Sequence, residues 1–343
     1  MAAMRNHTID SLRIVAILAV IVLHAKPFVS AQYLHTGFAP AGEILVQWAR
    51  FAVPFFFITT GYFLGKKQGD NCDTSTVRRY VKRIGLLYVA WCAIYFFVSP
   101  NWLLYLLDGN PKPLYWHLAA QTQQLINTPV LFALNGTRVH LWFLPALLIA
   151  VALTSLCRRA SARPACLISF AGLYLLGLLG DTYARTPFGL TIDPTVVHAF
   201  FYAPLLLVIG IALANRPAPG LTVALTLIAI GFAMQLFEAR MLVGSGAHLF
   251  ANYDFYLGTV PLSIGVLSLA LARPGWGQHT LAPLGKWVLG VYLVHLLVKD
   301  VLIILDKTLG GPLWEMGFPL LILIASLVLV SLAWRTRLRV LFQ

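Results

Sequence analysis

The sequence is poor in charged residues. They make up 11% of its 343 residues, whereas hydrophobic residues make up 59%; soluble domains typically contain about 25% charged residues. No polar stretch is long enough to form a separate soluble domain, and apolar stretches near the roughly 20 residues that cross a bilayer recur throughout the chain. The sequence therefore predicts an all-α, polytopic integral membrane protein with one domain over residues 1–339.

Acidic residues and cysteines are scarce as well. Twelve Asp and Glu stand against 25 Lys and Arg, which gives a net charge of +13. No nucleic-acid motif accompanies this charge, and basic residues of membrane proteins gather at cytoplasmic helix flanks, so we expect a lipid bilayer and no nucleic acid as partner. The four cysteines lack the spacing of a zinc or redox site. We expect no bound metal and free thiols at Cys72, Cys92, Cys157 and Cys166.

Apolar runs between polar residues predict about ten transmembrane helices. The expected spans are residues 10–28, 43–65, 80–99, 141–157, 164–180, 196–214, 220–237, 253–272, 286–304 and 316–334. With a cytoplasmic N-terminus, most Lys and Arg residues fall in cytoplasmic segments, which places both termini in the cytoplasm. The pattern specifies no oligomeric state.

Both ends of the chain need separate interpretation. Residues 29–31 loosely match a signal-peptidase site, but Lys26 and Pro27 lie between that site and the apolar run, so we expect a retained first span. Residues 340–343 resemble the remnant of a protease-cleavable tag, and we exclude them from the predicted fold.

Two ionisable residues of the first span, Arg13 and His24, are about three helical turns and about 16 Å apart. Ionisable groups within a bilayer usually face a bundle interior or a water-filled cavity. Asp10, one turn before Arg13, can pair with it. The spacing suits a long ligand with an anionic head and a reactive tip, such as coenzyme A. Taken singly, Arg13 is also typical of a cytoplasmic flank and His24 of a membrane interface.

A basic cluster opens the third predicted span and comprises Arg78, Arg79, Lys82 and Arg83. Cations at a helix N-terminus oppose the macrodipole, whereas the same end favours a bound phosphate. An anionic ligand would reconcile the two effects, and anchoring to acidic lipids is the alternative.

Two further spans carry unusual polar residues. In the second, Arg50 precedes Pro54 and the Thr60-Gly61 pair, and because proline frees a backbone carbonyl we expect a kinked helix with close packing at the glycine. In the ninth, a polar stripe lies on an otherwise apolar helix and consists of Tyr292, His295 and Lys299. His295 lies near mid-depth, where snorkelling does not explain it.

Aromatic and polar residues at the outer side are candidates for binding an acceptor. His140 and Trp142 open the fourth span, His198 opens the sixth, and Asp254 lies at the outer end of the eighth, where it could orient a histidine or be solvated. The connection over residues 100–140 also contains Trp102, Tyr105, Trp116 and His117. Interfacial anchoring by an aromatic belt explains these residues equally well.

Several of these motifs resemble those of the acyltransferase 3 family of membrane proteins. Asp10-Ser-Leu-Arg13, followed by an apolar run and His24, is similar to its first-helix motif. Blocks that match in the same order are Arg50 with Pro54-Phe55-Phe56 and Thr60-Gly61-Tyr62, Lys82-Arg83-Ile84, His140-Leu-Trp142-Phe143 and Gly290-Val-Tyr292-Leu-Val-His295. The family's usual Ser-Gly is Thr60-Gly61 here, and its Arg-x-x-Arg block is Arg79-Tyr-Val-Lys82-Arg83. Within the family, the chain looks most like O-acetyltransferases of enterobacterial common antigen and xanthan-type exopolysaccharides.

The resemblance implies acetyl-CoA as donor, a glycan or glycolipid as acceptor and the bacterial inner membrane as location. It also implies that His24 is the central catalytic residue and that Arg13 is essential. The expected site therefore comprises His24, Arg13, Arg50 and His295 for catalysis, Arg13, Arg78, Arg79, Lys82 and Arg83 for acetyl-CoA, and Trp142, His140, Tyr292 and Trp116 for the acceptor. His24 would act either as general base on the acceptor hydroxyl or as the nucleophile that carries the acyl group.

Two alternatives involve no covalent chemistry. A transporter or flippase of a lipid-linked saccharide would line its path with the same charges, but it predicts an inverted repeat with interrupted helices in both halves, and no repeat is visible in the sequence. A membrane-embedded sensor or scaffold would not require a basic cluster and a histidine at opposite ends of a ligand-length path.

Overall fold

The computed structural model describes residues 6–29, 33, 36–68, 74–155, 163–214, 216–244, 248–309 and 311–342. Over these residues the fold is all-helical and contains no β-strand, as predicted. The elements are α1 (His7–Ala25), α2 (Phe38–Ala49), α3 (Ala52–Gln68), α4 (Thr74–Phe97), α5 (Trp102–Leu107), α6 (Lys112–Asn127), α7 (Pro129–Asn135), α8 (Phe143–Thr154), α9 (Arg163–Gly180), α10 (Pro194–Val197), the π-helical turn η4 (His198–Tyr202), α11 (Ala203–Ala214), α12 (Leu221–Met241), α13 (Thr259–Ala272), the 3-10 helix η5 (Ala282–Trp287), α14 (Val288–Leu309), α15 (Pro312–Ala333) and the 3-10 helix η6 (Arg337–Leu341).

Six helices in the described part of the chain are long and apolar enough to span a membrane. They are His7–Ala25, Phe38–Lys67, Val77–Leu107, Leu221–Met241, Ala282–Leu305 and Pro312–Ala333. The shorter apolar helices are Phe143–Thr154, Pro164–Gly180, His198–Ala214 and Thr259–Ala272. The chain is thus a multi-pass membrane protein, whereas ten crossings and cytoplasmic termini stay predictions.

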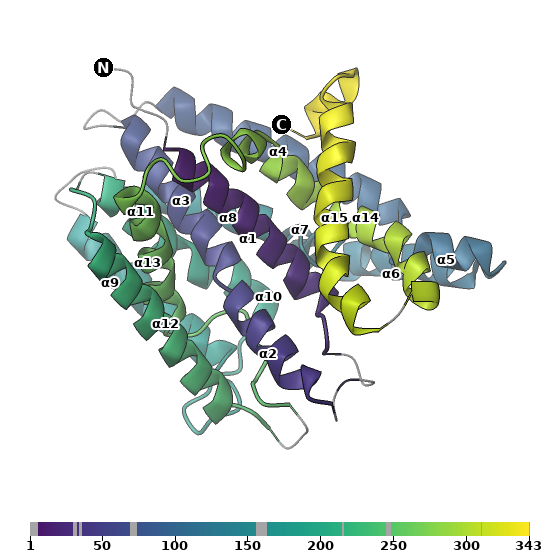
Figure 1. The fold of residues 1–343 in the computed structure, drawn as a ribbon, viewed down its shortest axis with the longest axis horizontal. Helices are drawn as coiled ribbons and strands as arrows, with labels where there is room; N and C mark the ends of the chain where they lie inside the picture. Colours follow the sequence, from purple (N-terminus) through teal and green to yellow (C-terminus); the bar gives the residue numbers. More distant parts are fainter. Residues whose placement is uncertain are drawn as a thin grey trace.

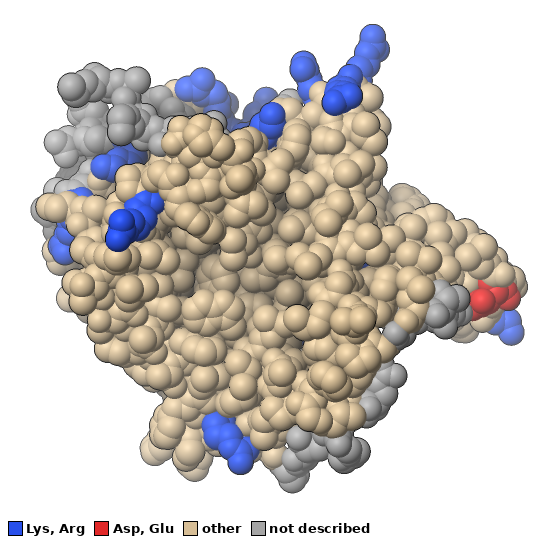
Figure 2. Space-filling model, viewed as in Figure 1, with Lys and Arg blue, Asp and Glu red and all other residues tan. Residues whose placement is uncertain are grey.

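The long helices form a bundle in which α1 begins and α15 ends at the same end of the molecule (Figure 1). On the face shown in Figure 2, Lys and Arg gather mainly toward that end, above a broad band without charged side chains. Such a distribution is typical of a membrane protein whose basic end faces the cytoplasm. We call this end, from which α1 starts, the inner end, and the opposite end the outer end. α5 and α6 project sideways from the bundle (Figure 1).

The second predicted span is broken at Arg50 and Phe51, between α2 and α3. Pro54 has no N–H to donate to the carbonyl of residue 50, so the helical ladder is interrupted there. The N–H groups of Arg50 and Phe51 instead bond to the carbonyls of Gln47 and Trp48, each at 3.3 Å. The predicted kink is therefore confirmed, one turn before the proline.

α3 packs closely against α11 through glycines from both helices. A Cβ added to Gly61 would lie 2.0 Å from the carbonyl oxygen of Leu207, and one added to Gly210 would lie 2.0 Å from that of Ile58. Any larger residue would push the two backbones apart. The close packing expected at the Thr60-Gly61 pair is thus confirmed.

The C-terminal segment packs onto α4. The Trp91 indole N–H donates to the Leu341 carbonyl at 2.7 Å, and the buried Phe342 ring lies 5.6 Å from the Trp91 ring. Residues near the C-terminus therefore contribute to the packed bundle, and the interpretation of residues 340–343 as a tag remnant stays a prediction.

One prediction about the cysteines holds and one is wrong. Cys92 is a free thiol, but Cys166 in α9 is disulfide-bonded. The spacing of cysteines along a chain does not reveal which Cα atoms the fold brings within bonding distance. Cys72 and Cys157 lie outside the described residues.

Candidate functional site

Three histidine rings from different parts of the chain meet inside the bundle. His24 comes from α1, His295 from α14, and His140 from the turn before α8. The His24 and His295 ring centroids are 5.3 Å apart, those of His140 and His295 5.1 Å, and those of His24 and His140 6.4 Å. Among the described side chains, no group of three His, Cys, Asp or Glu is arranged to hold a metal ion. We call these rings the histidine cluster.

Hydrogen bonds fix the tautomer of His295. Its Nδ1 lies 2.7 Å from the Tyr292 carbonyl oxygen, and because a carbonyl can only accept, Nδ1 carries the hydrogen and Nε2 presents a lone pair. This Nε2 is buried and has no hydrogen-bond partner among the described residues. Neither ring nitrogen of the buried His140 makes a well-aligned bond within the same part of the chain. Buried polar atoms left in this way are expected to meet water or a ligand.

The backbone that carries His24 is held by α14. α1 is one uninterrupted helix that ends just after His24, because Lys26 adopts a left-handed conformation with φ of 50° and Pro27 follows. The last carbonyls of a helix lack intrahelical partners. Lys299 supplies one, since its Nζ donates to the His24 carbonyl at 2.7 Å. Lys299 of the predicted polar stripe therefore positions the end of α1.

A cavity of about 200 Å³ opens on the outer side of the histidine cluster. We call it the outer cavity, and its lining includes His24, Lys26, Arg50, Trp142, Asn252 and Asp254. The Arg50 side chain is only 4% exposed, bonds to Asn252 and forms an ion pair with Asp254 at 3.1 Å. Asp254 thus orients Arg50, whereas its sequence position suggested that it would orient a histidine or be solvated.

A buried ion pair that was not predicted from the sequence lies behind the histidine cluster. Arg138 Nη2 and Asp300 Oδ2 are 2.6 Å apart, and both side chains are less than a tenth exposed. The Arg138 guanidinium also lies 5.5 Å from the centre of the Tyr95 ring, which is 5.1 Å from the His140 ring. Asp300 lies within a predicted span, and that position alone could have marked it as a residue needing a buried partner.

The Trp142 ring packs against a histidine outside the cluster, His198. The His198 ring lies 5.1 Å from the Trp142 ring, and His198 Nε2 is 3.2 Å from Asp181 Oδ2. Tyr202 also donates to this carboxylate at 3.2 Å. His198 and Tyr202 bound the π-helical turn η4, a distortion that often accompanies functional sites.

A narrower cavity of about 330 Å³ lies on the inner side of the cluster. We call it the inner cavity; its lining includes Arg13, Thr60, Arg83, Lys286 and Tyr292 together with apolar side chains. Arg83 and Lys286 also line a wider groove of about 900 Å³, which we call the basic groove and which includes Arg79 and Lys82. Because they share these two cations, the basic groove and the inner cavity are contiguous.

Close packing of η5 on α1 assembles the inner cavity. Arg13 pairs with Asp10 at 3.5 Å, as predicted. A Cβ added to Gly285 would lie 3.0 Å from the Asp10 Cβ, so glycine lets η5 approach and places Lys286 in the cavity wall. In the sequence, Lys286 stands at the start of the ninth predicted span, and no local pattern shows that η5 meets α1.

Tyr292 separates the inner cavity from the histidine cluster. Its ring lies 5.3 Å from the His140 ring and 6.1 Å from the His295 ring, and its hydroxyl donates to the His140 carbonyl. Arg78 is exposed, and Trp116 on α6 is 65% exposed. Neither lines the cavities described here, and their roles stay predictions.

Comparison with known proteins identifies the family. A family model described as "Acyltransferase domain" matches residues 6–336. The chain therefore belongs to the acyltransferase 3 family, as its motifs indicated, and this membership supports acyl transfer in general. No solved structure matches the chain.

Curated relatives cover parts of the chain. Two proteins of Enterococcus faecalis, each named "Amino-acid racemase", are 32% identical over 183 residues and 28% identical over 225 residues, or 52% and 61% of this chain and 23% and 28% of theirs. A "Serine/alanine racemase" of Enterococcus gallinarum is 27% identical over 314 residues, 85% of this chain and 40% of its own. The chain thus spans less than half the length of these relatives.

Proposed function

We propose that the protein transfers an acetyl group from acetyl-CoA to a hydroxyl of a cell-surface or lipid-linked glycan, in the bacterial inner membrane. One observation carries the proposal: α1 brings Arg13 to a cation-lined inner cavity and His24 to an outer cavity, on either side of the histidine cluster. The racemase activity in the relatives' names is not carried over, because the similarity covers at most 40% of their length.

The basic groove suits the nucleotide end of acetyl-CoA. Arg79, Lys82, Arg83 and Lys286 line it, and arginine in particular binds phosphate through paired N–H donors. The contiguous inner cavity is narrower, with Phe56, Leu144 and Leu147 among its walls, which fits a slender pantetheine arm. Arg13 would meet the arm or a phosphate at the junction.

In the proposed reaction His24 acts on the acceptor from the outer cavity. As general base it takes the proton from the hydroxyl, whose oxygen attacks the thioester carbonyl. The carbon–sulfur bond then breaks, and the proton passes to the departing CoA thiolate. The buried Arg50 guanidinium would stabilise the developing oxyanion or orient the acceptor. The alternative route, in which His24 carries the acetyl group, uses the same geometry.

His295 has a distinct part in this proposal. Because its Nδ1–H is committed to the Tyr292 carbonyl, its Nε2 can accept the N–H of His24 and leave the other His24 nitrogen free to act as base. Tyr292 and Phe143, whose rings are 5.5 Å apart, border the route between the inner cavity and His24.

The test uses the purified 343-residue chain in lipid nanodiscs. Acetyl-CoA should raise the thermal stability of the protein, because a ligand that binds only the folded state stabilises that state. The acetyl group of isotopically labelled acetyl-CoA should appear on bacterial glycans, where mass spectrometry detects it. His279, which is exposed between α13 and η5 and lines none of these cavities, provides the control variant His279→Ala. Normal transfer by His24→Ala, or no stabilisation by acetyl-CoA, would sink the proposal.

A transporter of a lipid-linked saccharide is the second candidate, favoured by one observation. Helices are interrupted in both halves of the described chain, at Arg50 between α2 and α3 and at the turn η4 before α11, and transporters place such breaks at their binding sites. A transporter does not require stabilisation by acetyl-CoA. It also predicts that His24→Ala abolishes uptake into vesicles rather than acetylation.

A further inference from the structure

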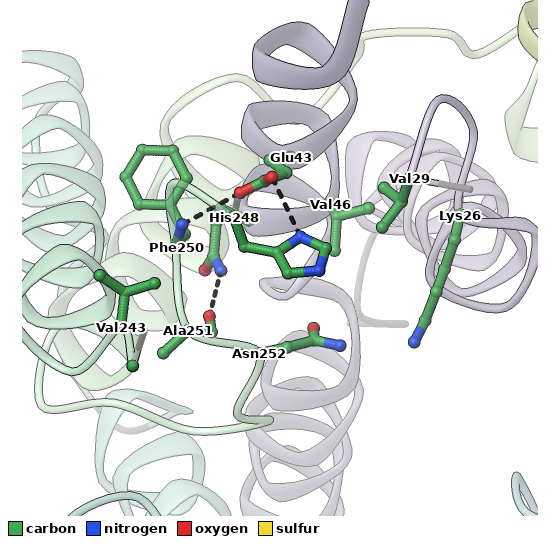
Figure 3. A pocket seen from close by; sticks show the side chains of 11 residues that line it. Lys26, Val29, Glu43, Val46, Val243, His248, Phe250, Ala251 and Asn252 are labelled. Atoms are coloured by element: carbon green, nitrogen blue, oxygen red, sulfur yellow. Dashed lines mark hydrogen bonds and ion pairs between the residues drawn. The ribbon is translucent and has the colours of Figure 1, made fainter. Parts of the chain in front are cut away.

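Figure 3 shows another cavity, of about 250 Å³. We call it the side pocket; it is formed by the end of α1, by α2 and by the segment after α12. Lys26, Val46 and Asn252 line both spaces, so the side pocket and the outer cavity are contiguous. An acceptor whose hydroxyl reaches His24 can therefore extend directly into the side pocket.

The carboxylate of the side pocket is already satisfied. Glu43 Oε1 lies 3.3 Å from His248 Nδ1, and Glu43 Oε2 accepts the backbone N–H groups of Leu249 and Phe250 at 2.7 and 3.0 Å. Figure 3 shows the contacts of Glu43 with the His248 ring and with the Phe250 N–H group. Glu43 therefore shapes the pocket and offers little free acceptor capacity to a ligand.

Groups that can hydrogen-bond a ligand remain available on three sides of the same space. Asn252 Oδ1 accepts from Arg50, which leaves its amide N–H groups as donors. His248 Nδ1 faces the Glu43 carboxylate and so carries the hydrogen, which leaves Nε2 to accept from a sugar hydroxyl. In Figure 3 the Lys26 amine, the Asn252 amide and the His248 ring face one another across the pocket. Lys26 makes no ion pair within the described ranges.

The charge balance favours an anionic occupant. Of the charged residues that line the two spaces, Arg50 pairs with Asp254 and Glu43 faces His248. The Lys26 side chain is exposed and forms no ion pair within the described part of the chain, so its ammonium can make a charge-assisted hydrogen bond to an oxyanion.

We propose that the side pocket binds the sugar unit next to the one that is acetylated, and that Lys26 selects a unit carrying an oxyanion. The shared chemistry is that of a uronate carboxylate or a sugar phosphate. This inference rests on the proposed function for the position of the reacting hydroxyl, while the pocket's affinity for an acidic saccharide stands independently.

Binding and transfer are measured separately with three disaccharides that share one neutral sugar. The second unit is glucose, glucuronic acid or glucose 6-phosphate, and the variants are Lys26→Gln and His248→Gln. The wild type should bind the acidic disaccharides roughly tenfold more tightly than the neutral one, the equivalent of one hydrogen bond to a charged group. Lys26→Gln should remove this preference, and His248→Gln should weaken binding of all three.

Exposed residues that do not line the pocket provide matched controls, Lys112→Gln at the start of α6 and His279→Gln between α13 and η5, and both should keep the preference. A preference for only one of the two acidic disaccharides identifies the oxyanion. Equal binding of acidic and neutral disaccharides by the wild type, or a preference that survives Lys26→Gln, overturns the inference. Lys26-dependent binding without acetyl transfer contradicts the proposed function but leaves the side pocket established.

Discussion

The two ends of α1 handle charge in opposite ways. At the inner end, cations line an open groove, and Arg79, Lys82 and Arg83 are exposed on α4. At the outer end, the main cation, Arg50, is buried and bonded to Asp254 and Asn252. A groove of exposed cations suits a polyanion that arrives from water, whereas a buried, bonded arginine is held ready for one geometry. In the proposed function, the inner end therefore captures the donor and the outer end carries out the chemistry.

Replacing His24 tests the outer end and should have the largest effect. His24→Ala removes the ring between the outer cavity and His295, and loss of a positioned base typically costs about 10²- to 10⁴-fold in rate. kcat for acetyl transfer should fall by this factor, while stabilisation by acetyl-CoA should stay near the wild-type value. If His24→Ala also lost acetyl-CoA binding, donor binding and catalysis would not be divided between the two ends.

Breaking the ion pair behind the histidine cluster tests how rigid the outer end is. Arg138→Met leaves the Asp300 carboxylate buried without its partner, which typically costs about 3–5 kcal/mol of folding free energy. Denaturation in mixed micelles should show this loss, and the double variant Arg138→Met/Asp300→Leu should recover much of it. The exposed Arg216→Met serves as control and should change stability by less than about 0.5 kcal/mol. Equal losses for the single and double variants would contradict a buried-charge origin.

The effects of substitutions at the two ends should depend differently on salt concentration. Arg83→Gln should raise the KM for acetyl-CoA roughly tenfold at low ionic strength, with kcat nearly unchanged, because phosphate capture is an electrostatic contribution to binding. The difference from wild type should shrink near 1 M salt, where the Debye length is about 3 Å. The defect of Arg50→Gln should persist there, since Arg50 is buried. Loss of both defects in salt would remove the distinction drawn between the ends.

Much of this comparison is visible in the sequence. The positions of Arg13 and His24 on one helix, the break near Pro54 and the polar stripe with His295 follow from helical periodicity and from the cost of burying polar groups. These are local properties, and each was recognisable within one span. The apolar runs likewise indicated where the helices lie.

What the sequence did not indicate depends on contacts between distant helices. Lys286 joins the inner cavity only because Gly285 lets η5 approach α1. Arg138 and Asp300 are 2.6 Å apart, yet the sequence position of neither residue indicates the other as its partner. Single-sequence patterns reveal faces of helices, whereas pairing between faces needs the packed structure. The histidine cluster is of the same kind, since its members come from three segments.

The smallest effect is expected at Lys299, which touches the backbone of His24 and not its ring. Its Nζ donates to the His24 carbonyl at 2.7 Å, so Lys299→Met should loosen the last turn of α1 and lower kcat by about three- to tenfold, the scale of one hydrogen bond. Lys299→Arg, which keeps a donor, should restore most of the rate, and the exposed Lys112→Met should have no effect. Acetyl-CoA affinity should stay unchanged in all three, because the inner cavity is lined by other residues. A rise in the KM for acetyl-CoA without a fall in kcat would instead place Lys299 on the donor side and extend the capture function of the inner end into the bundle.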